Sequence, residues 1–117
     1  MPARHLCSCH EPHAGVLAAV EAEMLPDEDL CDLSDFFKIF ADSTRLKVIW
    51  ALDRRALCVG ELADLLGMTC PAISHQLKIL KAARVVRAER KGRNVYYALA
   101  DHHVGDIVET GLEHIHE

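Results

Sequence analysis

The sequence predicts a mainly α-helical protein with one small β-hairpin, on the basis of three observations. Residues 57–80 carry two apolar helical repeats that Gly67 separates. Two short β-prone segments follow at residues 85–90 and 95–99, and a glycine-containing turn at residues 91–94 joins them. The other segments with apolar periodicity have helical spacing. A helix, a tight turn, a second helix and a hairpin together define a winged helix-turn-helix, which is the predicted fold.

The turn inside residues 57–80 has clear signals for the end of one helix and the start of the next. Gly67 can adopt the positive φ that ends a helix, and Thr69 is suited to cap the following one. Pro71 falls in the first turn of that second helix, where its missing N–H has little cost. One buried stripe is expected there, formed by Ile73, Leu77 and Leu80.

The side of the second helix opposite this stripe is small, polar and basic. It carries Pro71, Ser74, His75 and Lys78. A short helix with such a face is suited to the major groove of DNA. The hairpin adds cations that would contact phosphates or the adjacent minor groove, namely Arg90, Lys91 and Arg93. The alternative is an ordinary solvated pair of helices with a β-ribbon.

The charge distribution favours the DNA-binding interpretation. Residues 69–93 contain seven Lys or Arg and one acid, so this segment is +6, and the rest of the chain is −11 because the whole is −5. Phosphate binding needs a basic face and does not need a basic protein. The expected partner is double-stranded operator DNA, and a dimeric protein would read an imperfect palindrome.

The chain before residue 57 is expected to contribute an arm and three helices. Residues 1–13 form a Cys/His-rich arm without apolar periodicity, and residues 14–117 form one domain. The helices span residues 14–25, residues 30–41 and a third segment that ends at Arg54-Arg55, with Ser43 as the expected N-cap of the third. The second helix should face inward through Leu33, Phe36, Phe37 and Phe40, and the third through Leu46, Val48, Ile49 and Leu52.

The composition suggests a cytoplasmic protein with reduced cysteines. The sequence has no signal peptide and no stretch able to span a bilayer, so no membrane association is expected. In such a compartment the five unevenly spaced cysteines are expected to be thiols or metal ligands rather than disulfides.

The last helix should begin near Asp101 or His102 and continue to the C-terminus. Its apolar stripe consists of Val104, Ile107, Val108, Leu112 and Ile115. Little chain remains to cover this stripe. A second copy of the same helix is therefore a natural partner, and a homodimer is expected.

Metal-ligating residue types lie beside that stripe at both ends of the helix. His103 and His114 share a face but stand roughly 16 Å apart along the axis, so one helix cannot bring all its ligands to one ion. Two antiparallel helices related by a twofold axis could do so. Asp101 and His103 of one chain would then meet His114 and Glu117 of the other, forming two equivalent sites. Such a donor set suits Zn²⁺, and also Co²⁺. The alternative is that Asp101 is only an N-cap and the histidines are solvated.

Together, the segments LCVGELADLLGMTCPAISHQLKIL, RKGRNVYYAL and DHHV…LEHIHE resemble the ArsR/SmtB family of metal-sensing repressors over residues 30–117. The resemblance implies a homodimeric winged helix-turn-helix repressor whose apo form binds an operator beside genes for metal efflux or sequestration. Metal binding would weaken the DNA complex. The positions that match the family's C-terminal-helix site are Asp101, His103, His114 and Glu117, the residues selected above from spacing.

The resemblance also implies a second, thiolate-rich site in some members of the family. Cys58 matches its cysteine in the LCVxxLA segment, and Glu61 occupies a position where an acid can help. The arm of the partner chain would supply Cys7 and Cys9, with His10 as a possible addition. Gly60 stands where cadmium and lead sensors often have another cysteine. Such a soft site would favour Cd²⁺, Pb²⁺ or Zn²⁺. The alternative to a second site is that Cys58 is a small buried hydrophobic residue and that the arm is disordered.

Two other functions can be compared with a metal-responsive repressor. A thiol redox or persulfide sensor on the same fold would use Cys7, Cys9 or Cys58 without a metal. A metal-buffering protein would need no operator, and the basic helix and hairpin argue against it. An enzyme is not expected, because the sequence has no nucleophile–base pair, no phosphate loop and no HExxH motif. Cys31 and Cys70 match no site of the family: Cys31 is expected to serve in helix packing, and Cys70, at the start of the second helix, could contact DNA or be oxidised.

Overall fold

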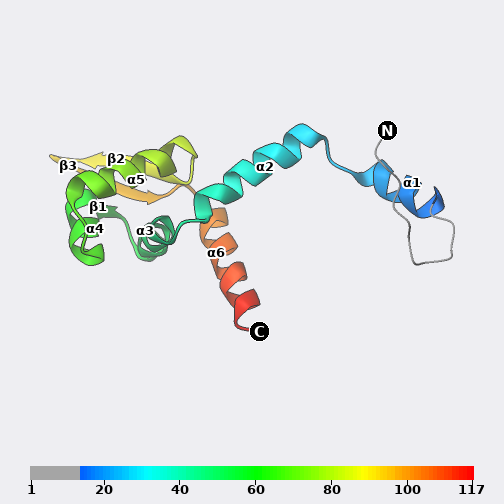
Figure 1. Ribbon diagram of the computed structural model, residues 1–117. Coiled ribbons are helices and arrows are strands. Elements are labelled where there is room, and N and C mark those ends of the chain that lie inside the picture. Colours follow the sequence, from blue (N-terminus) through cyan, green and yellow to red (C-terminus); the bar gives the residue numbers. More distant parts are fainter. Residues whose placement is uncertain (1–13) are drawn as a thin grey trace. The chain divides into compact units, whose positions relative to one another are not determined.

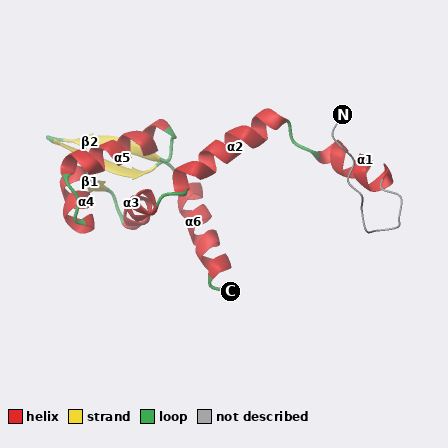
Figure 2. Ribbon diagram, in the orientation of Figure 1, coloured by secondary structure: helices red, strands yellow, loops and turns green. Residues whose placement is uncertain are grey.

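The computed structural model describes residues 14–117 (Figure 1). The chain divides into two compact units, with the boundary after Asp32. The elements are α1 (Ala14–Glu23), α2 (Asp27–Phe40), α3 (Ser43–Arg54), β1 (Leu57–Cys58), α4 (Val59–Leu66), α5 (Cys70–Ala82), β2 (Val86–Lys91), β3 (Asn94–Leu99) and α6 (His102–Ile115). Helices dominate and the strands form one small sheet (Figure 2), which confirms the predicted winged helix-turn-helix.

The sheet has three antiparallel strands in the order β1-β3-β2, one more than the hairpin that was predicted. Leu57 and Cys58 were expected to begin the first helix of the helix-turn-helix. Instead they pair with Tyr97 and Tyr96 of β3, and the helix starts at Val59. The prediction was wrong here because pairing with a distant strand is a tertiary effect that two residues of local sequence do not reveal.

The predicted hairpin is confirmed, with a tighter turn than expected. Lys91 pairs with Asn94, so only Gly92 and Arg93 lie between the strands. Gly92 has a φ of +65°, a conformation that glycine adopts without strain and that two-residue hairpin turns require. The strand β2 begins at Val86, one residue later than predicted.

The turn of the helix-turn-helix has the predicted capping. Gly67 has a φ of +63° and its N–H donates to the carbonyl oxygen of Ala63. Thr69 Oγ1 accepts a hydrogen bond of 3.2 Å from the N–H of Ala72, and Pro71 lies in the first turn of α5. These local interactions set the point at which α4 ends and α5 begins.

The hydrophobic core joins α3, α4, α5, β2 and the first turn of α6. Its largest fully buried side chains are Val48, Ile49, Leu62, Ile73, Leu77, Leu80 and Val85. Leu52 and Val104 are also buried. The predicted inward positions of α3 are thus confirmed for Val48, Ile49 and Leu52, whereas Leu46 is half-buried.

The inward face predicted for α2 is only partly correct. Phe36 and Phe40 pack against the core, with ring centroids 5.1 Å apart. Leu33 and Phe37 are exposed, because they form a neighbouring i, i+4 pair on a side of the helix that the described residues leave open. The helix also begins at Asp27, three residues before the predicted start.

The N-cap of α3 is Asp42 and not Ser43. Asp42 Oδ1 accepts hydrogen bonds from the N–H groups of Thr44 at 2.8 Å and Arg45 at 3.1 Å. A carboxylate accepts both orphan N–H groups more strongly than the neighbouring serine hydroxyl could, so the helix begins one residue early.

The first helix, α1, forms where it was predicted but ends two residues earlier. More than half of the side-chain surface of Val16, Leu17 and Val20 is exposed. None of the described helices has the length and apolar character needed to cross a membrane.

Candidate DNA-binding surface and metal-binding helix

The helix α5 presents the predicted DNA-facing residues to solvent. Ile73, Leu77 and Leu80 anchor one side of the helix in the core. The residues of the other side are all exposed: Pro71, Ser74, His75 and Lys78. Because the buried stripe fixes the rotation of the helix, these four side chains form a single outward face. The prediction of which residues share this face agrees with the geometry.

The hairpin carries its cations at the end that projects past the helices (Figure 1). Arg90, Lys91 and Arg93 are exposed. Among the described residues none of these three has a carboxylate within 4.0 Å, whereas Arg87, nearer the base, pairs with Glu89 at 3.5 Å. The cations at the tip are therefore available to an external anion.

The first turn of α6 brings together two of the four predicted C-terminal ligands. Asp101 is the N-cap of the helix, and its Oδ1 accepts a hydrogen bond of 2.9 Å from the N–H of His103. The same oxygen lies 3.2 Å from His103 Nδ1. The capping role that sequence reasoning gave as an alternative is thus compatible with a ligand role, because the carboxylate and imidazole remain exposed.

The last turn of α6 brings together the other two predicted ligands. His114 Nδ1 lies 3.0 Å from Glu117 Oε2, and both side chains are largely exposed. Each end of the helix therefore holds one imidazole beside one carboxylate, and each pair supplies one nitrogen and one oxygen donor.

Neither pair is a complete site within the described part of the chain. Residues 14–117 contain no group of three or more Cys, His, Asp or Glu side chains placed to hold one ion. A four-coordinate zinc site needs four donors, and each end of α6 offers two. The imidazole and carboxylate donors are of the types that zinc binds, and each end of α6 supplies half the number of donors that one site needs.

The structure describes two residues of the predicted thiolate-rich metal site, Cys58 and Glu61. The N–H of Cys58 donates a hydrogen bond of 3.0 Å to Glu61 Oε1 at the start of α4. This hydrogen bond, together with the Cys58 thiol and the nearby charge of Arg55, lowers the pKa of Glu61 below its usual range. The half-buried Cys58 and the exposed Glu61 therefore lie together. Cys7, Cys9 and His10 lie outside the described residues. Cys31 was expected to serve in helix packing, but it is exposed, as is Cys70.

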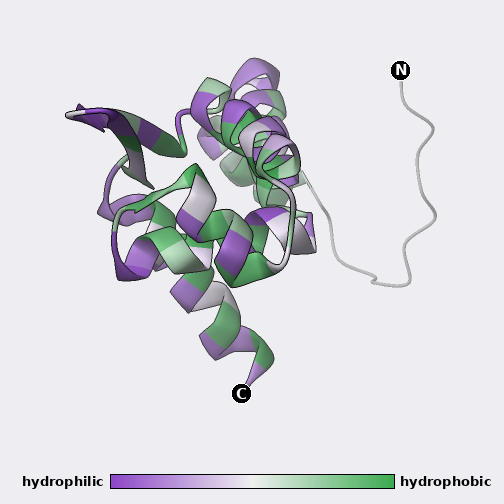
Figure 3. Cartoon of the chain, turned by 90° about the vertical axis from the view of Figure 1, so that its left-hand side faces the viewer, coloured by the Kyte–Doolittle hydropathy of each residue, from purple (hydrophilic) through white to green (hydrophobic). Residues whose placement is uncertain are grey.

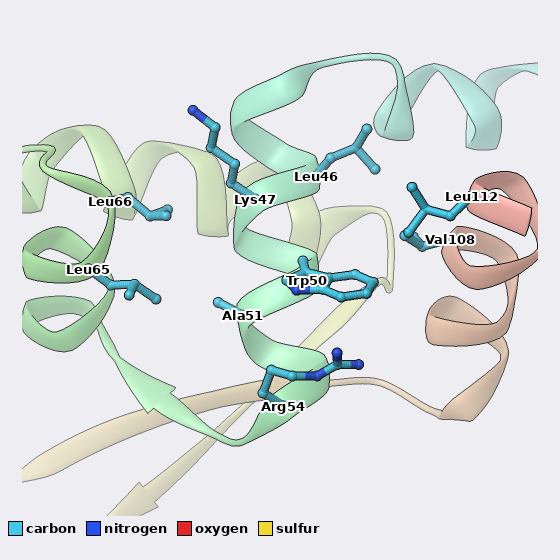
Figure 4. Close-up of a pocket in the computed structure, with 9 residues that line it drawn as sticks. All are labelled: Leu46, Lys47, Trp50, Ala51, Arg54, Leu65, Leu66, Val108 and Leu112. Carbon is cyan, nitrogen blue, oxygen red and sulfur yellow. The ribbon is translucent and has the colours of Figure 1, made fainter. Parts of the chain in front are cut away.

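Sequence reasoning missed an apolar groove between α3, α4 and α6 (Figure 4). Its volume is about 660 Å³, and its walls include Leu46, Trp50, Leu65, Val108 and Leu112. Trp50, the one tryptophan of the chain, is 41% exposed, and Arg54 Cζ lies 4.2 Å from the centroid of its ring. The sequence feature that could have indicated the groove is Trp50, which follows the core position Ile49 on a helix that was already assigned an inward face.

A second missed feature is the close approach of α3 and α6 at Gly105. A Cβ atom at this buried glycine would lie 2.7 Å from Asp53 Oδ1. Asp53 also pairs with Arg54 at 2.7 Å, and Arg54 Nη2 lies 4.0 Å from Glu109 on α6. The absence of a side chain at Gly105 therefore allows the start of α6 to rest directly on the end of α3.

Comparison with known proteins identifies the family. The family model described as "Bacterial regulatory protein, arsR family" matches residues 42–88. The chain is 38% identical over 111 residues to a transcriptional repressor SmtB homolog from Synechocystis sp., covering 93% of this chain and 84% of that protein. The chain belongs to the ArsR/SmtB family. It is also 32% identical over 94 residues to a cadmium resistance transcriptional regulatory protein CadC homolog from Staphylococcus aureus, covering 80% and 78% of the two chains.

Structural comparison agrees with this assignment. The crystal structure of the AntR antimony-specific transcriptional repressor superposes with a TM-score of 0.70 at 36% identity, covering 80% of this chain and 85% of that one. As an ArsR/SmtB-family chain, the protein is a winged helix-turn-helix transcriptional regulator, and the prediction that it is not an enzyme is confirmed by the nature of its relatives. The family model ends before α6 begins.

Proposed function

We propose that this ArsR/SmtB-family protein is a metal-responsive transcriptional repressor. Its apo homodimer binds operator DNA, and binding of Zn²⁺ releases the DNA and derepresses genes for metal efflux or sequestration. The observation that carries the proposal is the arrangement of α6, where an imidazole–carboxylate pair stands at each end of a helix whose apolar stripe is incompletely covered. The names of the relatives, which include a repressor and a cadmium resistance regulator, support the same conclusion.

The DNA-binding part of the proposal rests on α5 and the hairpin. Ser74, His75 and Lys78 would meet base edges and phosphates in the major groove, with Pro71 at the start of the helix. The exposed cations of the hairpin would meet phosphates or the adjacent minor groove. In a dimer, the spacing between the two α5 helices would determine the spacing of the half-sites in an imperfect palindrome.

The dimeric part of the proposal rests on the apolar surface of α6. Val108 and Leu112 line the groove beside Trp50, and Ile115 is 70% exposed. Hydrophobic residues continue along α6 to the last turn (Figure 3). A contiguous apolar surface of this kind is typical of a protein interface. We propose that a second copy of the chain covers it, with the two α6 helices antiparallel.

In that arrangement each half-site would be completed by the other chain. Asp101 and His103 of one protomer would lie against His114 and Glu117 of the partner, and twofold symmetry would give two sites. These four side chains would hold Zn²⁺, which would supply the positive charge that links the two chains. The four residues would then hold the two α6 helices in one relative pose. If this pose suits DNA poorly, metal and DNA affinities oppose each other by one coupling energy, about 1–3 kcal/mol.

A second effector site is proposed at Cys58. Its thiolate and the Glu61 carboxylate would be joined by Cys7 and Cys9 of the partner's arm, with His10 as an additional donor. Thiolate-rich donors prefer Cd²⁺ or Pb²⁺ over harder ions, whereas the nitrogen and oxygen donors of α6 suit Zn²⁺ or Co²⁺. The two sites would therefore differ in the metal to which they respond.

The deciding experiment is fluorescence anisotropy of the reduced protein on DNA from upstream of its own gene, titrated with Zn²⁺ and then with a chelator. We expect release by zinc and rebinding on chelation. His114→Ala should bind DNA like the wild type but lose the response to zinc. His116→Ala is the matched control, because it removes a neighbouring imidazole that is not paired with Glu117, and it should respond normally.

Other outcomes of this titration discriminate between the candidate switches. Release of DNA from His114→Ala by zinc would show that α6 does not hold the switch. Release by Cd²⁺ or Pb²⁺ alone would move the switch to Cys58. Release by an oxidant, with indifference to every metal, would overturn the proposal in favour of a thiol redox or persulfide sensor.

A further inference from the structure

A polar hollow lies between the end of α3 and the outer face of the hairpin. Its volume is about 430 Å³, and it is lined by Arg55, Ala56, Lys91 and Tyr96. These residues come from the link between α3 and β1, the last residue of β2 and the third residue of β3. Two cations and one phenol from separate parts of the chain therefore face a common space.

The strand register explains why Lys91 and Tyr96 share this space. Lys91 pairs with Asn94, so Tyr96 is its diagonal neighbour, two residues further along β3. Residues with this relation point to the same face of a hairpin. Val86 and Leu99 belong to the opposite face, which packs on the core. The hollow therefore lies on the outer face of the sheet.

Within residues 14–117, no carboxylate lines the hollow, and the nearby acids already have partners. Glu89 faces the same side, opposite Tyr96, but it lies 3.5 Å from Arg87. Glu61 feels the charge of Arg55, yet its Oε1 accepts the N–H of Cys58 at 3.0 Å. Among the described residues, neither Arg55 nor Lys91 has a carboxylate oxygen within 4.0 Å, whereas Arg45 and Arg54 each do. Both cations are therefore available to form ion pairs with an external anion.

We propose that this hollow binds a phosphodiester group of the operator backbone. Arg55 would donate paired N–H groups to two phosphate oxygens, Lys91 would add a second positive charge, and the Tyr96 hydroxyl would donate one hydrogen bond. The inference rests on the proposed function, because Lys91 belongs to the hairpin assigned there to DNA. It extends the DNA-binding surface from α5 and the hairpin tip to the junction of α3 and β1.

A phosphate contact at this place would position the hairpin without reading sequence. Backbone contacts fix the register of a protein on the duplex and are similar for all sequences. Each contact also adds to the salt dependence of binding, with a slope of about 0.9 per phosphate in a plot of log affinity against log salt concentration. Removing Arg55 should therefore affect operator and unrelated DNA alike, and this distinguishes it from a residue of α5.

The test compares Arg55→Ala with Arg87→Ala by fluorescence anisotropy at several salt concentrations. Arg87→Ala is the control, because it also removes one positive charge, from the outer face of the sheet and outside the hollow. For a dimer with two hollows, Arg55→Ala should lower the magnitude of the salt slope by about 2 and the affinity by about ten-fold, on both operator and unrelated DNA. Tyr96→Phe should weaken binding several-fold and leave the slope unchanged.

The outcomes separate this inference from the proposed function. Wild-type protein that does not bind DNA at all would contradict the proposed function itself. If the wild type binds and Arg55→Ala matches Arg87→Ala in slope and affinity, the hollow does not bind the operator backbone. Circular dichroism of both variants checks that they fold. A site that loses inorganic phosphate in Arg55→Ala, with DNA binding intact, would be a free-anion site and would also overturn the inference.

Discussion

The helices α5 and α6 are similar in length and in apolar periodicity, but they complete their packing in different ways. Every residue of the inner stripe of α5 is buried by its own chain. The stripe of α6 begins with Val104, which is 4% exposed, and ends with Ile115, which is 70% exposed. Where its stripe leaves the core, α6 also carries the His114–Glu117 pair, which offers two of the four donors that a zinc site would need.

The difference shows that the apolar stripe of α5 is buried completely within one chain, whereas that of α6 is buried only at its start. The helix that would read DNA has its inner stripe buried within one chain, so the fold of that chain sets which residues face outward. Among the described residues, the helix that would bind metal packs on the core through its first half, and its last turn is exposed. Specific DNA contacts need a preformed surface, whereas a switch needs an element whose position a ligand can change.

The largest effect should follow from opening the core beneath α5. Leu77→Ala removes a fully buried side chain, and cavities of this kind cost about 2–5 kcal/mol of unfolding free energy. Ile115→Ala, at the exposed end of α6, should change it by less than about 0.5 kcal/mol when the protein is monomeric. Denaturant titration at low protein concentration measures both. Equal losses would mean that α6 is as well packed as α5.

The next effect should appear in association. Leu112 lines the groove beside Trp50, so Leu112→Asp places a charge in the proposed dimer interface and should raise the dimer dissociation constant by about 100-fold or more. Thr110→Asp adds the same charge at an exposed position of the same helix and is the control. Sedimentation measures the mass, and the fluorescence of the single tryptophan reports the groove. An unchanged dimer in Leu112→Asp would place the interface elsewhere.

A smaller effect should separate capping from metal binding at the start of α6. Asp101→Asn keeps a side-chain oxygen for the N–H of His103, so helix stability should change by only a few tenths of a kcal/mol. The lost negative charge should lower zinc affinity by about ten-fold or more. For comparison, Thr69→Ala removes the cap of α5 and should cost about 1 kcal/mol without any effect on zinc. Zinc competition titrations and thermal unfolding distinguish the two roles.

The smallest effect concerns α3, the helix on which α6 rests. The N–H of Arg45, then that of Thr44 and the Arg45 guanidinium, lower the pKa of Asp42 from its ordinary value of 3.8. Folding therefore favours the ionised carboxylate, and this stabilisation is present above the unfolded-state pKa and is lost as pH falls through the lower folded-state value. The difference in unfolding free energy between wild type and Asp42→Asn should be constant from about pH 5 to 7 and shrink below about pH 4. A difference that persisted at pH 2 would contradict the assigned cause.

Local chemistry explains what the sequence could predict. The caps at Gly67 and Thr69, the glycine of the hairpin turn and the buried stripe of α5 all depend on residues within one or two turns of each other, and the structure confirms them. The four residues of the imidazole–carboxylate pairs were also selected from the sequence, because each pair lies within four residues at one end of α6, and their role as metal ligands stays a prediction.

What the sequence could not predict depends on contacts between distant segments. The strand at Leu57 and Cys58 exists because β3 lies beside it, and the groove at Trp50 needs three helices. The approach of Asp53 to Gly105 likewise joins residues far apart in the chain. A glycine inside a helix does not indicate, from the sequence alone, which residue packs against it.

That approach gives α6 the mechanics of a lever. The helix touches α3 where it has no side chain, and its last turn lies about 15 Å further along the axis. A tilt of about 10° at Gly105 would therefore move the far end by roughly 2.5 Å, slightly more than the length of a coordination bond. One pair of candidate ligands stands at the fulcrum and the other at the tip. In a twofold pair each fulcrum would hold the partner's tip, so a small change of angle would open or close both sites together.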